Sequence, residues 1–393
     1  MADLADRENK AMKEINAKKD WLDVVSYEIL GELPNPFVFN NGTPIRDATD
    51  WMKRRKEISK KVIDLQFGAM PPAPEIFTVE KLNQGKTHSS YKIKAGTKSH
   101  QLTFLMKIIA PAGIKRPMII NGDLCTEYYM HDGFVQAATE KGVGWVYFDR
   151  TELAHDIQNE GRRQGSLYDV YPDYDFGSLA AWAWGYSRCV DALEVLSLPY
   201  VDLNCLVFSG HSRGGKAAIL AGATDERAAI VNPNEACLGG SGCYRLRIEA
   251  DYGNLSRWRS ETLKDIYEST DFWFSSQMEQ YIDREDQLPF DAHYLKGLVA
   301  PRVLVVSEAT GDVWANPVGS LQTTLAATEI YKFLKCEENV YWYFRPGTHY
   351  HKRYDIEMLT NVICHVHDGY ALSGTFYNVP FKQIPPIFSW RSK

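Results

Sequence analysis

The 393-residue sequence lacks the patterns that mark several classes of protein. None of its 7 cysteines forms a CxxC pair, which excludes a zinc ribbon and a thioredoxin-type motif. No stretch approaches the roughly 20 consecutive apolar residues that a membrane-spanning helix needs. The formal net charge of −6 leaves no basic excess. We therefore expect a globular protein without a membrane or nucleic-acid partner.

The N-terminal stretch lacks the apolar core of a secretory signal, since residues 1–20 are rich in Lys, Glu and Ala. We expect either a cytoplasmic chain or a secreted protein made without its leader. The cysteines are odd in number and widely spaced, which predicts mostly buried thiols. A single bridge between Cys237 and Cys243 stays open at this point.

What the sequence does contain is the balance of a globular protein, with 45% hydrophobic and 24% charged residues. Residues 1–50 begin with a polar stretch and are expected to form a partly helical lead-in. Apolar positions in residues 51–66 recur at the spacing of an amphipathic helix, which the prolines of residues 70–75 end. We expect residues 51–393 to form a single domain.

From residue 102 onward, short apolar runs alternate with helical patterns. The predicted strands cover residues 102–109, 117–120, 144–148, 205–208, 229–231, 303–306 and 340–344. The predicted helices cover residues 132–141, 178–196, the stretch after 214, 321–333 and 356–368. Such alternation is typical of a doubly wound, mostly parallel sheet in a three-layer α/β/α sandwich. Residues 241–298 break it, are rich in aromatic residues, and are predicted to be an insertion over the carboxyl edge of the sheet.

The run Gly-His-Ser-Arg-Gly at residues 210–214 follows a predicted strand and opens a predicted helix. A serine nucleophile must be held out of a sharp strand-to-helix turn, and small flanking residues let such a turn close. The start of the helix also offers amide protons to an oxyanion. The alternative is a purely structural turn, but the order of strand, turn and helix favours Ser212 as a nucleophile.

Such a serine needs a general base, and in this architecture the chain order is serine, acid, histidine. His349 follows a predicted strand and fits that order, with His351 as the competing imidazole. The acid has two candidates, Asp312 and Glu235, and each follows a predicted strand. Both lie at carboxyl ends of strands, so the residues alone do not choose between them.

These residues belong to a wider pattern that resembles the glucuronoyl esterases of carbohydrate esterase family 15. The family's elbow, Gly-Cys-Ser-Arg-x-Gly-Lys, is similar to residues 210–216, and its Asn-Glu-x-x-x-Gly-Gly run to residues 234–240. Its Pro-Phe-Asp-x-His run into an Ala-Pro-Arg strand is similar to residues 288–306, its Asp-x-Trp-x-x-Pro to 312–317, and its Arg-x-Gly-x-His to 345–349. The resemblance covers about residues 50–370. It implies an α/β-hydrolase that cleaves esters between lignin alcohols and the 4-O-methyl-glucuronic acid of xylan.

The resemblance also implies roles for individual side chains. It makes Ser212 the nucleophile and His349 the base, and it puts Glu235 and Asp312 at the two acid positions known in the family. Arg213 is expected to reinforce the oxyanion hole. The expected sugar-contacting residues are Lys216, Trp314 and Glu268, while Trp258, Trp273 and Tyr281 of the 241–298 segment offer rings for stacking on a sugar or for capping the core.

The chain departs from the family pattern at His211, where the fungal members carry a Cys that forms a disulfide. That bridge cannot form here. The loop at residues 236–238 also differs from the usual form of the family.

The sequence thus predicts a serine esterase for carbohydrate esters, similar to a 4-O-methyl-glucuronoyl methylesterase, with a Ser-His-Glu/Asp acyl-enzyme mechanism. The alternatives are an acetylxylan esterase or other small-ester carboxylesterase, and a non-catalytic carbohydrate-binding homologue. The histidines show no spacing typical of a metal site, residues 349–351 being the nearest to one. We expect no cofactor, no metal ion, a monomer, and a small-molecule or polysaccharide glucuronate ester as the substrate.

Overall fold

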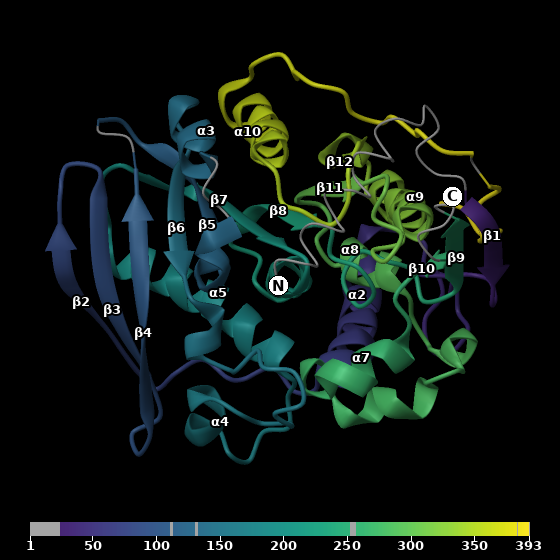
Figure 1. Cartoon of the computed structure of the whole chain (residues 1–393), viewed down its shortest axis with the longest axis horizontal. Coiled ribbons are helices and arrows are strands. Elements are labelled where there is room, and N and C mark those ends of the chain that lie inside the picture. Colours follow the sequence, from purple (N-terminus) through teal and green to yellow (C-terminus); the bar gives the residue numbers. More distant parts are fainter. Residues whose placement is uncertain (1–23, 111–112, 130–132, 252–256, 383, 393) are drawn as a thin grey trace.

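The computed structural model describes residues 24–392 except 111–112, 130–132, 252–256 and 383. Its main feature is a nine-stranded sheet with the strand order β12-β11-β8-β7-β5-β6-β4-β3-β2 (Figure 1). The strands are β2 (Ile76–Gln84), β3 (His88–Gly96), β4 (Gln101–Ile109), β5 (Arg116–Asn121), β6 (Gly144–Phe148), β7 (Val201–His211), β8 (Ala228–Asn234), β11 (Val303–Ala309) and β12 (Val340–Arg345).

The strands from β12 to β6 in this order run parallel, whereas β4, β3 and β2 are added antiparallel. Every residue of β6 and β11 is buried, as expected of a parallel strand covered on both faces. In β4, buried and exposed residues alternate, which is typical of an antiparallel strand with one covered face. The predicted doubly wound, mostly parallel sheet is confirmed.

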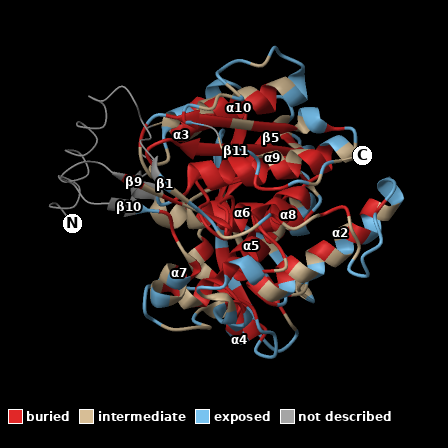
Figure 2. Ribbon diagram, turned by 90° about the vertical axis from the view of Figure 1, so that its right-hand side faces the viewer, coloured by how far each residue is buried: buried red, intermediate tan, exposed pale blue. Residues whose placement is uncertain are grey.

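Helices cover both faces of the sheet. The α-helices of the described residues are α2 (Ala48–Val62), α3 (Phe134–Glu140), α4 (Ser166–Val170), α5 (Ser178–Leu196), α6 (Arg213–Thr224), α7 (Leu263–Thr270), α8 (Ala292–Gly297), α9 (Pro317–Phe333) and α10 (Arg353–Asp368). Neighbouring residues of β6 point to opposite faces: Trp145 packs with Phe134 of α3 and Leu359 of α10, and Val146 lies in the cluster that contains Trp182 of α5. The sheet is therefore the buried middle layer of a three-layer sandwich (Figure 2).

The described part of the lead-in that precedes α2 contains a strand. Val24–Ile29 form strand β1, which pairs antiparallel with β9 (Leu246–Asp251), and β9 also pairs with β10 (Arg257–Arg259). The partner of β1 is more than 200 residues away in the sequence, so no local pattern reveals it. Residues 1–23 of the expected lead-in lie outside the described residues.

The 241–298 segment contributes β9, β10 and α7 to the structure and ends in α8, which packs against α2 and α9. Its last residues thus belong to the main helical layer, while its role as an insertion over the site stays a prediction. No helix among the described residues has the length and apolar character needed to cross a bilayer. All seven cysteines are free thiols, so Cys237 and Cys243 are not bridged.

Candidate active site

Ser212 lies at the turn between β7 and α6. Its backbone has φ 56° and ψ −123°, a conformation that is unfavourable for a residue with a Cβ atom. The turn closes because Gly210 has no side chain: a Cβ atom there would lie 2.3 Å from the carbonyl oxygen of Gly214. The Ser212 amide donates a hydrogen bond to the carbonyl oxygen of Asn234 at 2.9 Å, which ties the turn to the end of β8.

The Ser212 hydroxyl is in hydrogen-bonding contact with an imidazole. The distance from Ser212 Oγ to His349 Nε2 is 2.8 Å, and His349 Nδ1 lies 2.5 Å from Asp312 Oδ2. The three side chains follow β7, β12 and β11, whose carboxyl ends meet at one edge of the parallel sheet. The His349 side chain is 34% exposed and the Asp312 side chain 2%, so the acid is enclosed while the imidazole remains accessible.

Glu235 is the other predicted acid, and it has a different set of partners. Its Oε2 atom lies 3.5 Å from His349 Nδ1, beyond the Asp312 contact, while Arg345 donates to its Oε1 atom. Arg345 Nε is also 2.9 Å from each carboxylate oxygen of Asp355. The structure therefore brings both predicted acids to the imidazole and hydrogen-bonds Asp312 to it.

The protonation preferences of these groups differ. Burial lowers the pKa of His349, but the charge and hydrogen bond of Asp312 raise it by more, so the pKa lies above the ordinary histidine value. Burial raises the pKa of Glu235 well above its ordinary value, and the Arg345 guanidinium opposes that rise without cancelling it. The carboxylate whose charge and hydrogen bond raise the pKa of His349 is Asp312.

Arg213, the first residue of α6, lies next to the nucleophile. The first amides of a helix have no partner within the helix and are available to an oxyanion. Arg213 Nη1 donates to Asp156 Oδ1 at 2.9 Å, and its Cζ atom lies 4.8 Å from the ring centroid of Trp273. Trp273 is 5% exposed and lies in the main core, so its ring is a support for the guanidinium more than an open stacking surface.

Lys216 lies one turn further along α6 and is buried. Its Nζ atom donates to the carbonyl oxygen of Ala236 at 3.0 Å and to Glu261 Oε2 at 3.2 Å, and lies 5.4 Å from the Trp273 ring centroid. The Lys216 side chain is 1% exposed, which excludes the reading of a helix-surface charge. Glu261 was not predicted, because no motif or spacing in the sequence singles it out.

Glu268, a predicted sugar-contacting residue, is a surface side chain. Glu268 lies on the outer face of α7, with its side chain 64% exposed, and its ion-pair partner is Lys264 at 4.0 Å. The buried face of this helix carries Leu263 and Ile266 instead. The carboxylate that reaches Lys216 is therefore Glu261, seven residues earlier.

The remaining predicted aromatic residues are placed at different depths. Trp314 is 36% exposed, and its carbonyl oxygen accepts a hydrogen bond from the Glu261 amide at 3.0 Å, which puts it at the rim beside that carboxylate. Tyr281 is partly buried against the main core. Trp258 lies in β10 in register with Ala250, and its side chain lies outside the described residues.

Two further imidazoles stand beside the general base candidate. The His211 ring lies 4.8 Å from the His349 ring and 5.2 Å from the His351 ring, and it stacks on the latter with an interplanar angle of 12°. His211 Nδ1 is 2.7 Å from Asn234 Oδ1. Burial, together with the charges of His349 and His351, holds the pKa of His211 well below its usual range. His351 therefore contacts the ring of His211 and leaves the serine contact to His349.

Side chains that can bind a metal ion are present here, but the one that they share already uses both of its ring nitrogens in other contacts. Among the described residues, two groups have donor atoms within 4.8 Å of one another: His211, Glu235 and His349, and Cys237, Asp312 and His349. Both share His349, whose two ring nitrogens already contact Ser212 and Asp312. A metal ion at either group would have to displace one of these contacts.

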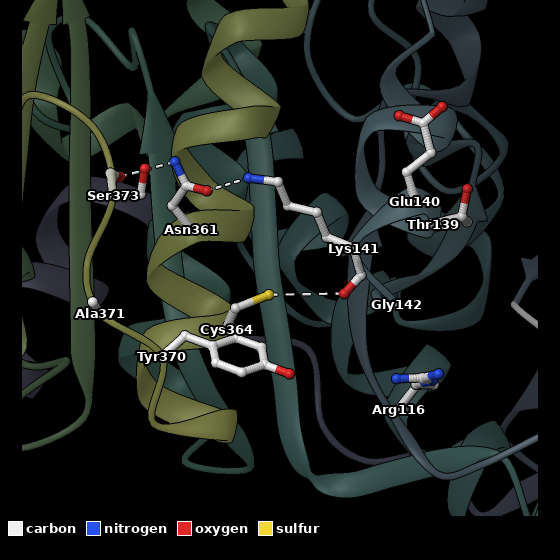
Figure 3. A pocket seen from close by; sticks show the side chains of 10 residues that line it. All are labelled: Arg116, Thr139, Glu140, Lys141, Gly142, Asn361, Cys364, Tyr370, Ala371 and Ser373. Carbon is white, nitrogen blue, oxygen red and sulfur yellow. Dashed lines mark hydrogen bonds between the residues drawn. The ribbon is translucent and has the colours of Figure 1, made fainter.

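A pocket of about 510 Å³ lies elsewhere, between α3 and α10 (Figure 3). It lies at the amino ends of β5 and β6, the edge of the sheet opposite to Ser212, since Arg116 begins β5 and Gly142 precedes β6. Lys141 Nζ donates to Asn361 across it. None of the predicted site residues lines this pocket.

Comparison with known proteins gives consistent matches. The family model for "Glucuronyl esterase, fungi" matches residues 93–335. The 4-O-methyl-glucuronoyl methylesterase of Schizophyllum commune is 33% identical over 327 residues, which cover 81% of this chain and 77% of that protein. The enzyme of the same name from Phanerochaete carnosa is 30% identical over 326 residues, with 81% and 76% covered.

Solved structures are similar over most of the chain. A carbohydrate esterase family 15 glucuronoyl esterase from Caldicellulosiruptor kristjansonii superposes with a TM-score of 0.79 at 26% identity, covering 92% of this chain and 97% of that one. A glucuronoyl esterase from Sporotrichum thermophile, with a serine replaced by alanine, is in complex with methyl 4-O-methyl-beta-D-glucopyranuronate. It has a TM-score of 0.72 at 26% identity, with 88% and 90% covered.

Proposed function

Because the chain belongs to the glucuronoyl esterases of carbohydrate esterase family 15, we propose that it is a serine esterase for esters of glucuronic acid. We propose more narrowly the activity that its relatives are named for, that of a 4-O-methyl-glucuronoyl methylesterase. The observation that carries the proposal is the hydrogen-bonded series from Asp312 through His349 to Ser212, with distances of 2.5 and 2.8 Å. It lies at the sheet edge where α/β-hydrolases hold their active groups.

In the first half of the reaction, Ser212 Oγ attacks the ester carbonyl carbon while His349 Nε2 accepts the hydroxyl proton. Asp312 holds the imidazole in the required tautomer and stabilises the imidazolium. The resulting oxyanion is met by the first amides of α6 and by Arg213, and one such donor is worth about 10²- to 10³-fold in turnover. When the tetrahedral intermediate collapses, the C–O bond to the alcohol breaks, and His349 gives its proton to the departing oxygen.

The second half of the reaction repeats these steps with water. His349 accepts a proton from the water molecule as its oxygen attacks the acyl carbon, and the proton then passes to Ser212 Oγ as the acyl bond breaks. The product is the free uronic acid. No step requires a metal ion or a cofactor.

The sugar is held by the polar and aromatic groups beside the nucleophile. Lys216 Nζ uses two of its three protons on Ala236 and Glu261, and the third is available to an oxygen of the substrate. A cation and a carboxylate at this distance suit the hydroxyl and ring oxygens of a sugar acid better than a fatty acyl chain. Trp314 supplies a half-exposed indole at the rim.

The test compares ester classes in the intact protein. Hydrolysis of methyl glucuronate, benzyl glucuronate and acetylated xylan is measured for the wild type, for Ser212→Ala and for Ser99→Ala, which changes an exposed serine after β3. We expect the two glucuronate esters to be hydrolysed, with a loss of roughly 10⁵-fold in Ser212→Ala and none in Ser99→Ala. Hydrolysis of acetylated xylan with no activity on either glucuronate ester would instead favour an acetylxylan esterase.

A further inference from the structure

A row of side chains with alternating charge runs from the nucleophile turn to Arg213. The His211 amide donates to Asp123 Oδ2 at 2.9 Å, and Arg150 Nη1 donates to the other oxygen of the same carboxylate. Arg150 Nη2 donates to Asp156 Oδ2 at 3.2 Å. Arg213 Nη1 then donates to Asp156 Oδ1 at 2.9 Å. Each carboxylate thus accepts hydrogen bonds through both of its oxygens.

The row is buried except at its last member. The exposed fractions of the side chains are 5% for Asp123, 2% for Arg150, 9% for Asp156 and 32% for Arg213. The Arg150 guanidinium also lies 5.0 Å from the ring centroid of Trp182. Charges in such surroundings are weakly screened, so each charged side chain of the row interacts strongly with its neighbours. The row ends at Arg213, the residue that follows the nucleophile.

The beginning of the row lies against the nucleophile turn itself. Gly214 has no side chain, and a Cβ atom there would lie 2.0 Å from Asp123 Oδ1. The Asp123 carboxylate is therefore pressed against the first turn of α6 while it accepts the amide of His211, the residue before Ser212. The same row thus contacts the backbone on both sides of Ser212 and the side chain of Arg213.

We propose that Asp156 is a positioning residue for the oxyanion-binding Arg213, an inference that rests on the function proposed above. Among the described residues, Nη1 is the Arg213 nitrogen with a hydrogen-bond partner, so the N–H groups of Nε and Nη2 are left for the developing oxyanion. The guanidinium also packs against the Trp273 ring, with 4.8 Å between Cζ and the ring centroid. Asp156 sets the rotation of the guanidinium plane, and Arg150 and Asp123 hold Asp156 in place.

The experiment is a double-mutant cycle between Asp156→Asn and Arg213→Ala, with methyl glucuronate as the substrate and thermal unfolding measured for each variant. We expect Asp156→Asn to lower kcat by about 10- to 100-fold while KM changes less than about threefold, because the guanidinium acts on the transition state. In the double variant we expect kcat within about twofold of that of Arg213→Ala alone, since Asp156 acts through Arg213. If Asp156→Asn does not fold, Asp156→Glu, which keeps the charge and moves it by one methylene group, takes its place in the cycle.

The matched control is Asp191→Asn. Asp191 also bridges two arginines, Arg188 at 2.6 Å and Arg227 at 2.7 Å, but its side chain is 24% exposed and it lies on α5. We expect it to keep the wild-type kcat. The inference is overturned if Asp156→Asn keeps the wild-type kcat, if its loss multiplies with that of Arg213→Ala, or if Asp191→Asn loses as much.

The failure of the proposed function would look different. A wild-type protein that hydrolyses p-nitrophenyl acetate but no glucuronate ester would contradict the substrate proposal alone. The same cycle on p-nitrophenyl acetate would then still measure the coupling of Asp156 to Arg213.

Discussion

Two carboxylates flank the His349 imidazole, and removal of each should have a different effect. Asp312→Ala removes the contact of 2.5 Å to Nδ1, a hydrogen bond that becomes charged when the imidazole takes up its proton. Such a bond is worth up to about 3 kcal/mol, which corresponds to roughly 10²-fold in kcat. Complete loss of the acid from a triad costs about 10⁴-fold. We expect the smaller loss, about 10²- to 10³-fold, because Glu235 Oε2 stands 3.5 Å from the same nitrogen and is close enough to take over in part.

Glu235→Gln should act chiefly on stability. It leaves the Asp312 contact intact, so we expect kcat to fall less than about tenfold. It replaces the charged partner of the buried Arg345 by a neutral amide, whose oxygen still accepts a hydrogen bond, and Arg345 keeps its two bonds of 2.9 Å to Asp355. We therefore expect a loss of about 1–3 kcal/mol in the free energy of unfolding, less than for a buried charge left without any partner.

The assay is hydrolysis of methyl glucuronate at saturating substrate, with thermal unfolding of each variant. The double variant of Asp312→Ala and Glu235→Gln should approach the full loss of about 10⁴-fold, because no acid then remains beside the imidazole. Glu338→Gln, an exposed carboxylate near the start of β12, serves as the control and should match the wild type. The reasoning is refuted if Glu235→Gln, measured while folded, slows turnover as much as Asp312→Ala.

Three further predictions concern the same site. His349 must be neutral to accept a proton, and its pKa is raised above the ordinary 6.5. In a pH–rate profile, kcat/KM should therefore fall as the pH drops through that raised pKa. In Asp312→Ala the fall should move to lower pH, because the group that raises the pKa is gone. Glu261→Gln should raise KM for glucuronate esters about tenfold, while Glu268→Gln, the matched surface change, should leave it unaltered; equal effects in steady-state kinetics would contradict the assignment. Lys216→Ala should lower kcat/KM for methyl glucuronate at least about tenfold more than for p-nitrophenyl acetate, and equal losses on the two esters would remove the argument for a sugar acid.

The sequence predicts those parts of the fold that depend on local pattern. Helix α5 and strand β6 begin and end at the predicted residues, because the helical pattern of Ser178–Leu196 ends at Ser197 in a left-handed conformation and the apolar run of Gly144–Phe148 ends at Asp149. Parallel pairing follows from apolar strands joined by helices. The strand order explains why Ser212 and His349 meet although 137 positions separate them.

The sequence does not predict which residues of distant segments lie close together when no motif links those segments. Glu261 follows β10 and contacts Lys216 of α6, 45 positions earlier in the chain, and nothing in the local sequence marks it. Glu268 lies on the exposed face of α7, which the local sequence does not reveal. The choice between the two acids depends on a difference of 1 Å at His349 Nδ1, which no residue pattern encodes. The monomeric state stays a prediction.

The pairing of β1 with β9 links residues 24–29 to the segment that carries Glu261, the carboxylate paired with Lys216. The Ile248 amide of β9 donates to Ser260 Oγ at 3.1 Å, and the Ser260 amide returns a bond of 3.0 Å to the Ile248 carbonyl, one residue before Glu261. Trimming Val24–Ile29 would strip β9 of one neighbour and bare an unpaired strand edge. We expect such a shortened protein to bind the glucuronate ester more weakly, whereas the contacts from Asp312 through His349 to Ser212 should persist because they are held by the central sheet.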